Sequence, residues 1–260
     1  MYSYTSLSYG DDIGMKRNIQ ILLEYDGSNY HGWQRQKNAL TIQEKLEEAI
    51  QQISDEEVTI IGSSRTDSGV HARGQSANFY TQSKISVDKI PYAMNSKLPK
   101  DIRVYKAIER PLEFHSRYHA VGKKYSYHIQ NTIFPSALEY NRTWHIAQKL
   151  NIQNMKKANK FFIGTHDFSA FRASGSSVKT SIRTITFSKL IHKDEKVILE
   201  IEGNGFLYHM VRIIIGTLVE VGIGKISFEE IPDIINSKDR NRAGMTAPPY
   251  GLYLEKVFYE

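Results

Sequence analysis

The chain contains no cysteine among its 260 residues. Disulfides, thiol nucleophiles and thiolate metal sites are therefore excluded, and the composition is compatible with a reducing cytoplasm. Long apolar runs are also missing. The most apolar segment, residues 206–222, contains His209, Arg212 and Glu220, whereas a membrane-spanning helix needs about 20 mainly apolar residues. The sequence thus predicts a cytoplasmic protein that does not cross a membrane.

The N-terminus shows no targeting signal. MYSYTSLSYGDDIG lacks the basic start and the apolar run of a secretory signal peptide. We expect residues 1–16 to form a flexible tail.

Several catalytic signatures are absent as well. There is no P-loop, and no cluster of acidic residues that would support two-metal phosphoryl chemistry. His115 and His119 have the spacing of a helical metal pair, but no HExxH pattern accompanies them, which favours packing or phosphate contact. The Gly203-Asn204-Gly205 stretch is read as a turn. We therefore predict no metal site.

The charge is moderately basic. Lys plus Arg number 34 and Asp plus Glu 28, a formal net charge of +6. Such a surface suits a polyanionic partner such as nucleic acid, although ordinary basic enzymes share this balance. With 40% hydrophobic and 24% charged residues, the composition is globular and allows one large or two modest domains.

Strand and helix patterns alternate twice along the chain. In the first half they predict strands within 17–30, 58–61, 74–81 and 102–109, and helices behind Thr41 and from Ser86 to Leu98. In the second half they predict strands in 121–131, 181–190, 196–203 and 252–260, and helices in 151–164, in 206–222 and behind Ser227. The expected fold class is α+β. Two similar α/β units, 17–110 and 111–260, would have largely antiparallel sheets with helices on one face and an active cleft between them.

The stretch GSSRTDSGVHARGQ, residues 62–75, connects two predicted strands and is here called the signature loop. It places one carboxylate, Asp67, close to Arg65 among small and flexible residues. Because aspartate has an ordinary pKa of about 3.9, this acid suits a nucleophile or an electrostatic stabiliser better than a proton donor. The alternative is an aspartate that only caps a turn. Glycosidase chemistry needs two carboxylates, and the loop supplies one, although a distant acid could fold in.

Aromatic and basic residues are interleaved at four places: residues 30–35, 117–118, 123–125 and 208–212. Rings stack on bases and cations neutralise phosphates, so the pattern favours nucleic-acid binding over ordinary strand packing only when the groups are taken together.

Arg212 lies inside an otherwise apolar helix. A buried unpaired charge costs several kcal/mol, so we expect an anionic partner, with Asp67 as the candidate. The alternative is an arginine that snorkels to the helix edge.

The signature loop strongly resembles the Gly-Arg-Thr-Asp-Ala-Gly-Val-His-Ala motif of the TruA family of tRNA pseudouridine synthases. Ser64 and Ser68 stand where glycine and alanine are usual, and both are small. The resemblance extends in order and spacing from about residue 17 to the C-terminus. It includes EYDGSNYHGWQRQ, FHSRYHAVGKKYSYHI, DFSAFRA, GFLYHMVRIIIGTLVEVG and PPYGLYLEKVFY.

This resemblance implies isomerisation of uridine to pseudouridine at positions 38, 39 and 40 of the tRNA anticodon stem-loop, by a homodimer without metal or organic cofactor. It implies that Asp67 is the catalytic aspartate and that Tyr125 stacks on the target base. Arg65 would displace the target nucleotide and occupy its place. Arg212 would pair with the aspartate in a basic cleft between two α/β halves.

The sequence leaves two other functions open. The first is a non-catalytic tRNA-binding protein on the same scaffold, against which the presence of Asp67, Arg65, Tyr125 and Arg212 argues. The second is an N-glycoside hydrolase that releases uracil.

Overall fold

A computed structural model describes residues 15–175, 178 and 180–260. Most of the expected tail, residues 1–14, lies outside the described residues. The first half contains β1 (Arg17–Tyr25), α1 (Ile42–Ser54), β2 (Ile61–Gly62), β3 (His71–Thr81), α2 (Ile90–Asn95) and β4 (Ile102–Arg110). The second half contains β5 (Ala120–Asn131), β6 (Trp144–Ile146), α3 (Ile152–Lys160), β7 (Gly164–Asp167), β8 (Ile182–Lys193), β9 (Lys196–Gly203), α4 (Met210–Gly222), α5 (Ile231–Ser237) and β10 (Leu252–Tyr259).

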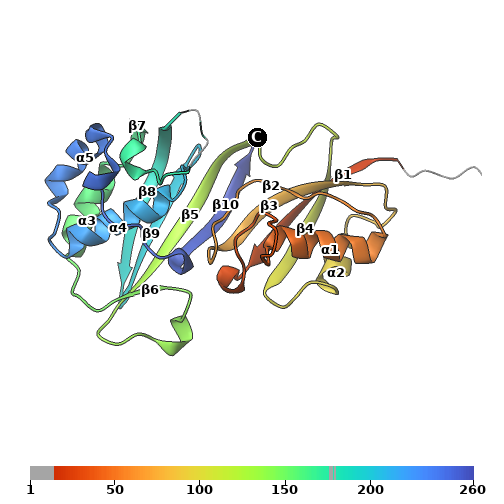
Figure 1. Cartoon of the computed structure of the whole chain (residues 1–260), viewed down its shortest axis with the longest axis horizontal. Coiled ribbons are helices and arrows are strands. Elements are labelled where there is room, and N and C mark those ends of the chain that lie inside the picture. The colour runs from red at the N-terminus through yellow and green to blue at the C-terminus, as the bar shows by residue number, and fades with distance from the viewer. Residues whose placement is uncertain (1–14, 176–177, 179) are drawn as a thin grey trace, which may run out of the picture.

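The strands form one sheet in the order β4-β1-β3-β10-β5-β9-β8-β7, with β2 added to β3 and β6 to β5. All pairs are antiparallel except β10 with β3 and β5 with β6. The predicted α+β class with a largely antiparallel sheet is confirmed. The sequence indicated a separate sheet in each half of the chain, whereas the structure has one sheet. The final strand, β10, lies between β3 of the first half and β5 of the second half and joins the two halves (Figure 1).

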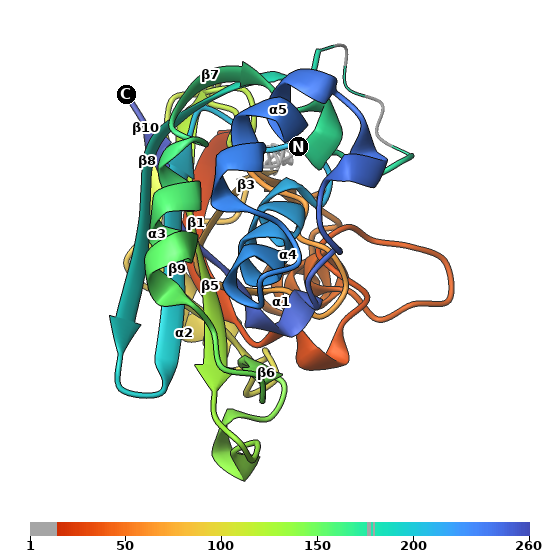
Figure 2. The ribbon, with the colours of Figure 1, turned by 90° about the vertical axis from the view of Figure 1, so that its left-hand side faces the viewer.

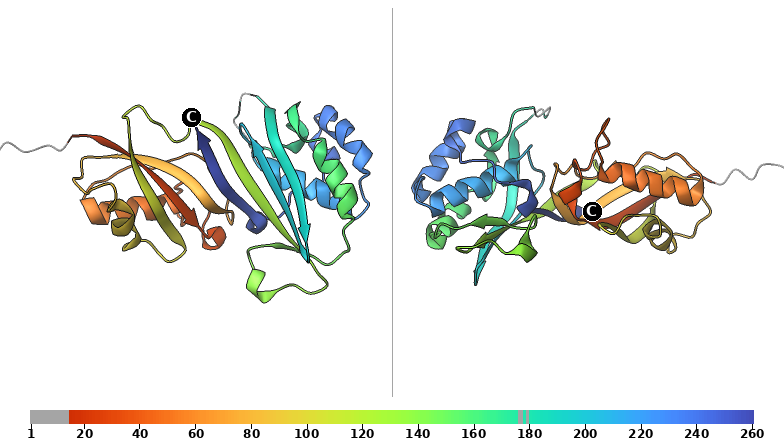
Figure 3. Two further views of the ribbon diagram at one scale, coloured as in Figure 1. Left: turned by 180° about the vertical axis from the view of Figure 1, so that it is seen from behind. Right: turned by 60° about the horizontal axis from the view of Figure 1, so that its bottom comes forward.

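The larger helices cover one face of this sheet. Seen from behind, the strands lie in front and the helices beyond them (Figure 3), and the side view places α1 and α4 on the same side of the strands (Figure 2). α4 is apolar on nearly every side and is almost wholly buried, as expected for a helix enclosed by other elements. Among the described residues, no helix has both the length and the apolar character needed to cross a bilayer.

The first strand and the first helix form where the sequence predicts them. The apolar side chains of β1, Ile19, Ile21 and Leu23, are fully buried. α1 begins after Thr41, whose hydroxyl accepts a hydrogen bond from the Glu44 N–H. This contact satisfies one of the free N–H groups at the start of the helix.

Three predicted boundaries differ from the structure. The strand expected at 58–61 is wrong apart from its last residue, because the Ile60 N–H donates to a Glu47 carboxylate oxygen at 3.0 Å instead of to a strand. The helix expected from Ser86 is confined to α2, with Pro91 in its first turn. β3 begins at His71, earlier than expected, because it pairs there with β10. A partner so distant in sequence leaves no trace in the local pattern.

Candidate active site

The signature loop is held from behind by residues 30–33. The Trp33 N–H donates to the Thr66 carbonyl at 3.0 Å, and the Gly69 N–H donates to the Tyr30 carbonyl at 3.3 Å. The hydroxyls of Tyr25 and Thr66 are 2.7 Å apart. These contacts on either side of Asp67 fix the backbone that carries its carboxylate.

Gly32 makes this close approach possible. It has φ +90°, a left-handed conformation that favours glycine. A Cβ at this position would lie 2.6 Å from the Thr66 carbonyl oxygen. Glycine at position 32 therefore allows residues 30–33 to pack closely behind the signature loop.

Asp67 is contacted by two side chains from the second half of the chain. Arg212 Nη1 lies 3.2 Å and His209 Nε2 lies 3.3 Å from the same oxygen, Oδ2. Within the described part of the chain, no side chain or backbone group bonds to Oδ1. The carboxylate is therefore held through one oxygen, and its other oxygen is available to a ligand.

Arg212 has the anionic partner that its position in an apolar helix predicts. Its side chain is 12% exposed, so the alternative of a snorkelling arginine is wrong. Its Nε donates to the Ala247 carbonyl at 2.8 Å, and the Ala247 N–H donates back to the Arg212 carbonyl at 3.0 Å. The guanidinium is thereby fixed at two points and joins Asp67 to the segment that precedes β10.

His209 is a second neighbour of Asp67, and the sequence did not predict this contact. It precedes α4 with φ 59°, an uncommon conformation for a non-glycine residue that clusters at functional sites. Burial lowers the pKa of its imidazole, opposed by the nearby Asp67 carboxylate. At neutral pH the uncharged ring can donate its Nε2–H to Asp67. The only sequence signal was the aromatic–basic pair Tyr208-His209, whose rings are 3.9 Å apart.

Tyr125 lies on β5 and lines the same cavity as Asp67. Its hydroxyl is 2.8 Å from the Ser64 hydroxyl, and its ring meets Phe206 edge-on at 5.2 Å. Burial raises the pKa of the Tyr125 phenol to about 12, with a smaller contribution from Asp67. The phenol therefore keeps its proton at neutral pH.

These side chains line a cavity of about 320 Å³. Arg65, exposed at its edge, has no hydrogen-bonding or ionic partner among the described residues. Arg117 and Lys123 line the cavity as well. With Arg212, four basic side chains line the cavity that contains Asp67, an arrangement that suits a ligand with several negative charges.

Lys123 is the second residue that sequence reasoning did not single out. Its Nζ donates to the Ser63 carbonyl at 2.9 Å, which leaves two N–H donors of the ammonium unused. Burial, together with the Arg117 charge, lowers the pKa of Lys123 to about 8. Only its place in the stretch Lys123-Lys124-Tyr125 pointed to it.

The histidine pair considered from its spacing does not form a metal site. The His115 N–H donates to His119 Nδ1 at 3.3 Å, and His115 Nδ1 accepts from the Arg117 N–H at 3.1 Å. Among the described residues, no three His, Asp or Glu side chains are grouped so that they could hold a metal. The two rings stabilise the turn before β5.

The chain matches the family model described as tRNA pseudouridine synthase over residues 21–119 and 158–260. It is 57% identical to proteins named tRNA pseudouridine synthase A from Acetivibrio thermocellus, over 243 residues, and from Thermoanaerobacter sp., over 244 residues. It is 50% identical to a protein of that name from Ruminiclostridium cellulolyticum. Each match covers 94% of this chain and the whole of the relative. The chain therefore belongs to the tRNA pseudouridine synthase family.

Proposed function

We propose that this protein isomerises uridine to pseudouridine at positions 38, 39 and 40 of the tRNA anticodon stem-loop. The observation that carries the proposal is the carboxylate of Asp67 inside a basic cavity, anchored through Oδ2 and without a hydrogen-bond partner at Oδ1 among the residues that the structure describes. The names of the relatives support the reaction and tRNA as substrate. The three positions rest on the resemblance of the motifs.

The reaction is balanced without a redox partner or net consumption of water. The N1–C1′ bond breaks, the uracil turns, and a C5–C1′ bond forms. The proton on C5 leaves, and N1 gains one. Asp67 Oδ1 can attack C1′ or remove the C2′ proton to give a glycal, and both routes use the same carboxylate. We propose that neither a metal nor an organic cofactor takes part.

Three other residues serve the substrate in this proposal. Arg212 fixes the orientation of Asp67 from α4. The protonated phenol of Tyr125 presents its ring to the target base, with a stacking contribution of about 1–3 kcal/mol. Moving a base out of its helix costs a few kcal/mol, and Arg65, which is exposed and unpaired among the described residues, can offset part of this by filling the gap.

The proposal extends to the assembly. The resemblance implies a homodimer in which one tRNA touches both subunits, and residues 17–110 and 111–260 would be the two domains of each. Because the substrate is tRNA, we place the protein in the cytoplasm. Light scattering of the purified protein tests the dimer: a mass near twice 29.9 kDa supports it, and a monomer at working concentration contradicts it.

Tritium at uracil C5 of a tRNA transcript tests the reaction. Isomerisation releases this label into water, because C5 exchanges its hydrogen for C1′. A hydrolase would instead release labelled uracil, and a binding protein would leave the label in the tRNA. We expect label in water and no free uracil. Either of the other outcomes, under conditions where tRNA binds, contradicts the proposal.

Binding of tRNA should weaken steeply with salt. Each phosphate neutralised by Lys or Arg releases counterions, with a slope of about −0.7 to −0.9 per contact in a plot of log K against log salt. Titration of labelled tRNA between about 50 and 200 mM salt measures the slope. A value near zero would show that the basic cavity does not contact the phosphates.

We also expect binding to weaken as the pH rises through about 8. Lys123 has a pKa of about 8 in the free protein, and a bound phosphate favours the charged amine, so the midpoint should lie at or above this value. Loss of one charged contact corresponds to about 1.5–3 kcal/mol, roughly ten- to hundredfold in Kd. We expect Lys123→Gln to bind tRNA weakly at all pH values, with a Kd that does not change as the pH rises through about 8. An identical pH dependence in both proteins would rule out the contact.

A further inference from the structure

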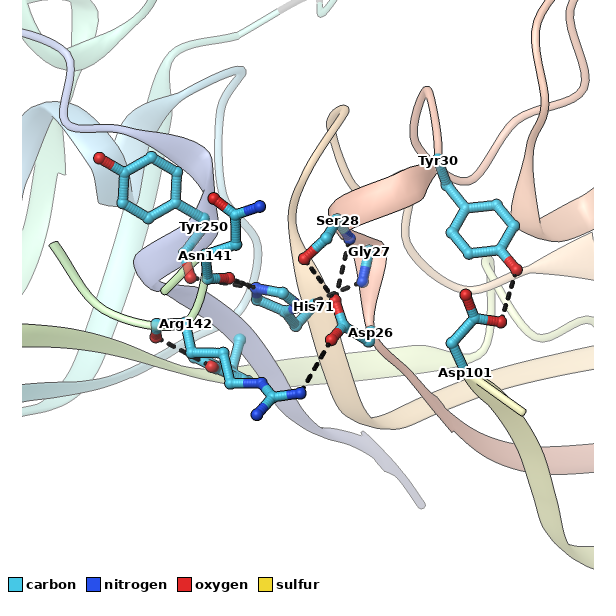
Figure 4. A network of polar contacts seen from close by, with 10 residues as sticks. Asp26, Gly27, Ser28, Tyr30, His71, Asp101, Asn141, Arg142 and Tyr250 are labelled. Carbon is cyan, nitrogen blue, oxygen red and sulfur yellow. Dashed lines mark hydrogen bonds and ion pairs between the residues drawn. The ribbon is translucent and has the colours of Figure 1, made fainter. Parts of the chain in front are cut away.

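His71 is a buried histidine for which the proposed chemistry has no use. It stands four residues after Asp67, at the start of β3, and is 2% exposed. Figure 4 shows its ring between two parts of the chain, with Asp26 and Gly27 on one side and Asn141 and Tyr250 on the other.

The contacts of His71 fix its protonation. The Gly27 N–H donates to Nδ1 at 3.0 Å, so Nδ1 presents a lone pair. Nε2 lies 2.9 Å from the Asn141 carbonyl and 3.0 Å from the Tyr250 carbonyl, so Nε2 carries the proton. Only the neutral Nε2–H tautomer satisfies all three contacts.

The charges around the ring are compatible with this neutral form. Asp26 Oδ1 lies 3.2 Å from Nδ1 and favours protonation, but it also accepts from the Ser28 N–H and hydroxyl, and its other oxygen faces Arg142 at 3.5 Å. Burial, the largest effect, lowers the pKa of His71. The rings of Tyr253 and His71 stack at 4.7 Å.

The Tyr250 carbonyl belongs to residues 247–251, here called the crossing segment, which follows α5 in the chain and leads directly into β10. Its Ala247 carbonyl accepts from Arg212, as described above, and its Pro248 carbonyl accepts from the Tyr127 hydroxyl at 2.8 Å. Pro249 lies against Gly69 of the signature loop, where a Cβ would be 3.1 Å from its ring. The crossing segment therefore touches both the loop of Asp67 and the guanidinium that holds it.

The sheet is narrowly joined at this point. β10 pairs with β3 through only two registered pairs, Tyr253 with His71 and Leu254 with Ala72. Asp67 comes from one side of this junction and Arg212 from the other. Additional contacts that bridge the junction are needed to hold these two side chains at a fixed distance.

We propose that His71 is a positioning residue: as the Nε2–H tautomer, imposed by the Gly27 N–H, it anchors the crossing segment and so sets the contact between Arg212 and Asp67. This inference rests on the proposed function of the site. A displacement of about 1 Å at a reacting group can reduce turnover about 100-fold, so a residue that acts only through the crossing segment can control the rate.

Two substitutions distinguish the contributions of the two ring nitrogens of His71. The amide of His71→Gln reaches the position of Nε2 and can donate to the carbonyls. The amide of His71→Asn is shorter and reaches only the position of Nδ1. We expect His71→Asn to lower kcat about 10- to 100-fold with little change in KM for tRNA. His71→Gln should restore most of this loss.

His128→Asn is the matched control. His128 is partly buried and also packs against Tyr253, with ring centroids 4.8 Å apart, but its Nε2 contacts the Ser126 hydroxyl and not the crossing segment. We expect this variant to lose stability and keep kcat. Equal losses in kcat for His71→Asn and His71→Gln, or a loss of kcat in His128→Asn as large as in His71→Asn, would overturn the proposal.

The tautomer can be measured without any activity. Two-bond proton–nitrogen correlations of the histidine rings in the folded wild-type protein should show His71 protonated at Nε2 alone. A proton on Nδ1 would overturn the proposal. If the wild type forms no pseudouridine, the proposed function fails, whereas the tautomer measurement still reports on the anchor itself.

Discussion

Asp67→Asn should abolish pseudouridine formation, with a loss of at least about 10³-fold in kcat, because an amide can neither attack C1′ nor remove the C2′ proton. Asparagine keeps the shape of the side chain and can still accept a hydrogen bond from Arg212. The loss should therefore appear in turnover, while Kd for tRNA stays within about threefold of wild type. Tritium release under single-turnover conditions and a binding titration measure the two quantities separately.

The control for this experiment removes a carboxylate elsewhere. Asp88 is exposed, does not line the cavity, and has Ser86 and Lys89 as neighbours. Asp88→Asn should leave turnover unchanged. Turnover by Asp67→Asn within tenfold of wild type would remove Asp67 from the reaction.

Tyr125→Leu should lower turnover about 100-fold or more, because a leucine cannot stack on the target base and leaves Ser64 without its hydroxyl partner. Tyr125→Phe keeps the ring and loses only that hydrogen bond, which corresponds to about 1 kcal/mol. Because burial raises the pKa of this phenol to about 12, the phenol stays protonated at neutral pH and cannot serve as a general base. We therefore expect the Phe variant to retain more activity than the Leu variant.

Measuring kcat and KM for the three proteins decides between these roles. A Phe variant as inactive as the Leu variant would show that the hydroxyl, and not the ring, serves the reaction. Equal activity in all three would contradict any role at the base. Thermal unfolding of each variant shows whether a loss of activity reflects loss of the fold.

Much of the fold could be predicted because its patterns are local. The alternation in β1, the cap at Thr41 and the apolar run of α4 each depend on residues close in sequence. The single sheet could not be predicted, since it depends on β10 lying between β3 and β5. The prediction of a strand at 58–61 was wrong for a related reason. The carboxylate of Glu47, in α1, accepts the hydrogen bond from the Ile60 N–H that the pattern assigned to a strand.

In the candidate site, too, the contacts that follow from local sequence could be predicted and those that depend on distant segments could not. An arginine in an apolar helix requires an anion, and this physical demand predicted the pair between Arg212 and Asp67. No comparable demand pointed to His209, whose contact with Asp67 depends on a left-handed backbone before α4. The burial of Lys123 and the anchoring of His71 likewise arise from chain segments that meet only in the folded protein.

The most direct test of this account is to map pseudouridine in a tRNA transcript that carries uridine at positions 38, 39 and 40. The transcript is incubated with the purified wild-type protein. Because pseudouridine and uridine have the same mass, each position is then read after carbodiimide labelling, which leaves a stable adduct only on pseudouridine and stops reverse transcription there. We expect pseudouridine at these positions and none elsewhere in the anticodon arm. Modification outside this stretch would contradict the proposed substrate, and an unmodified transcript that is nevertheless bound would contradict the proposed reaction.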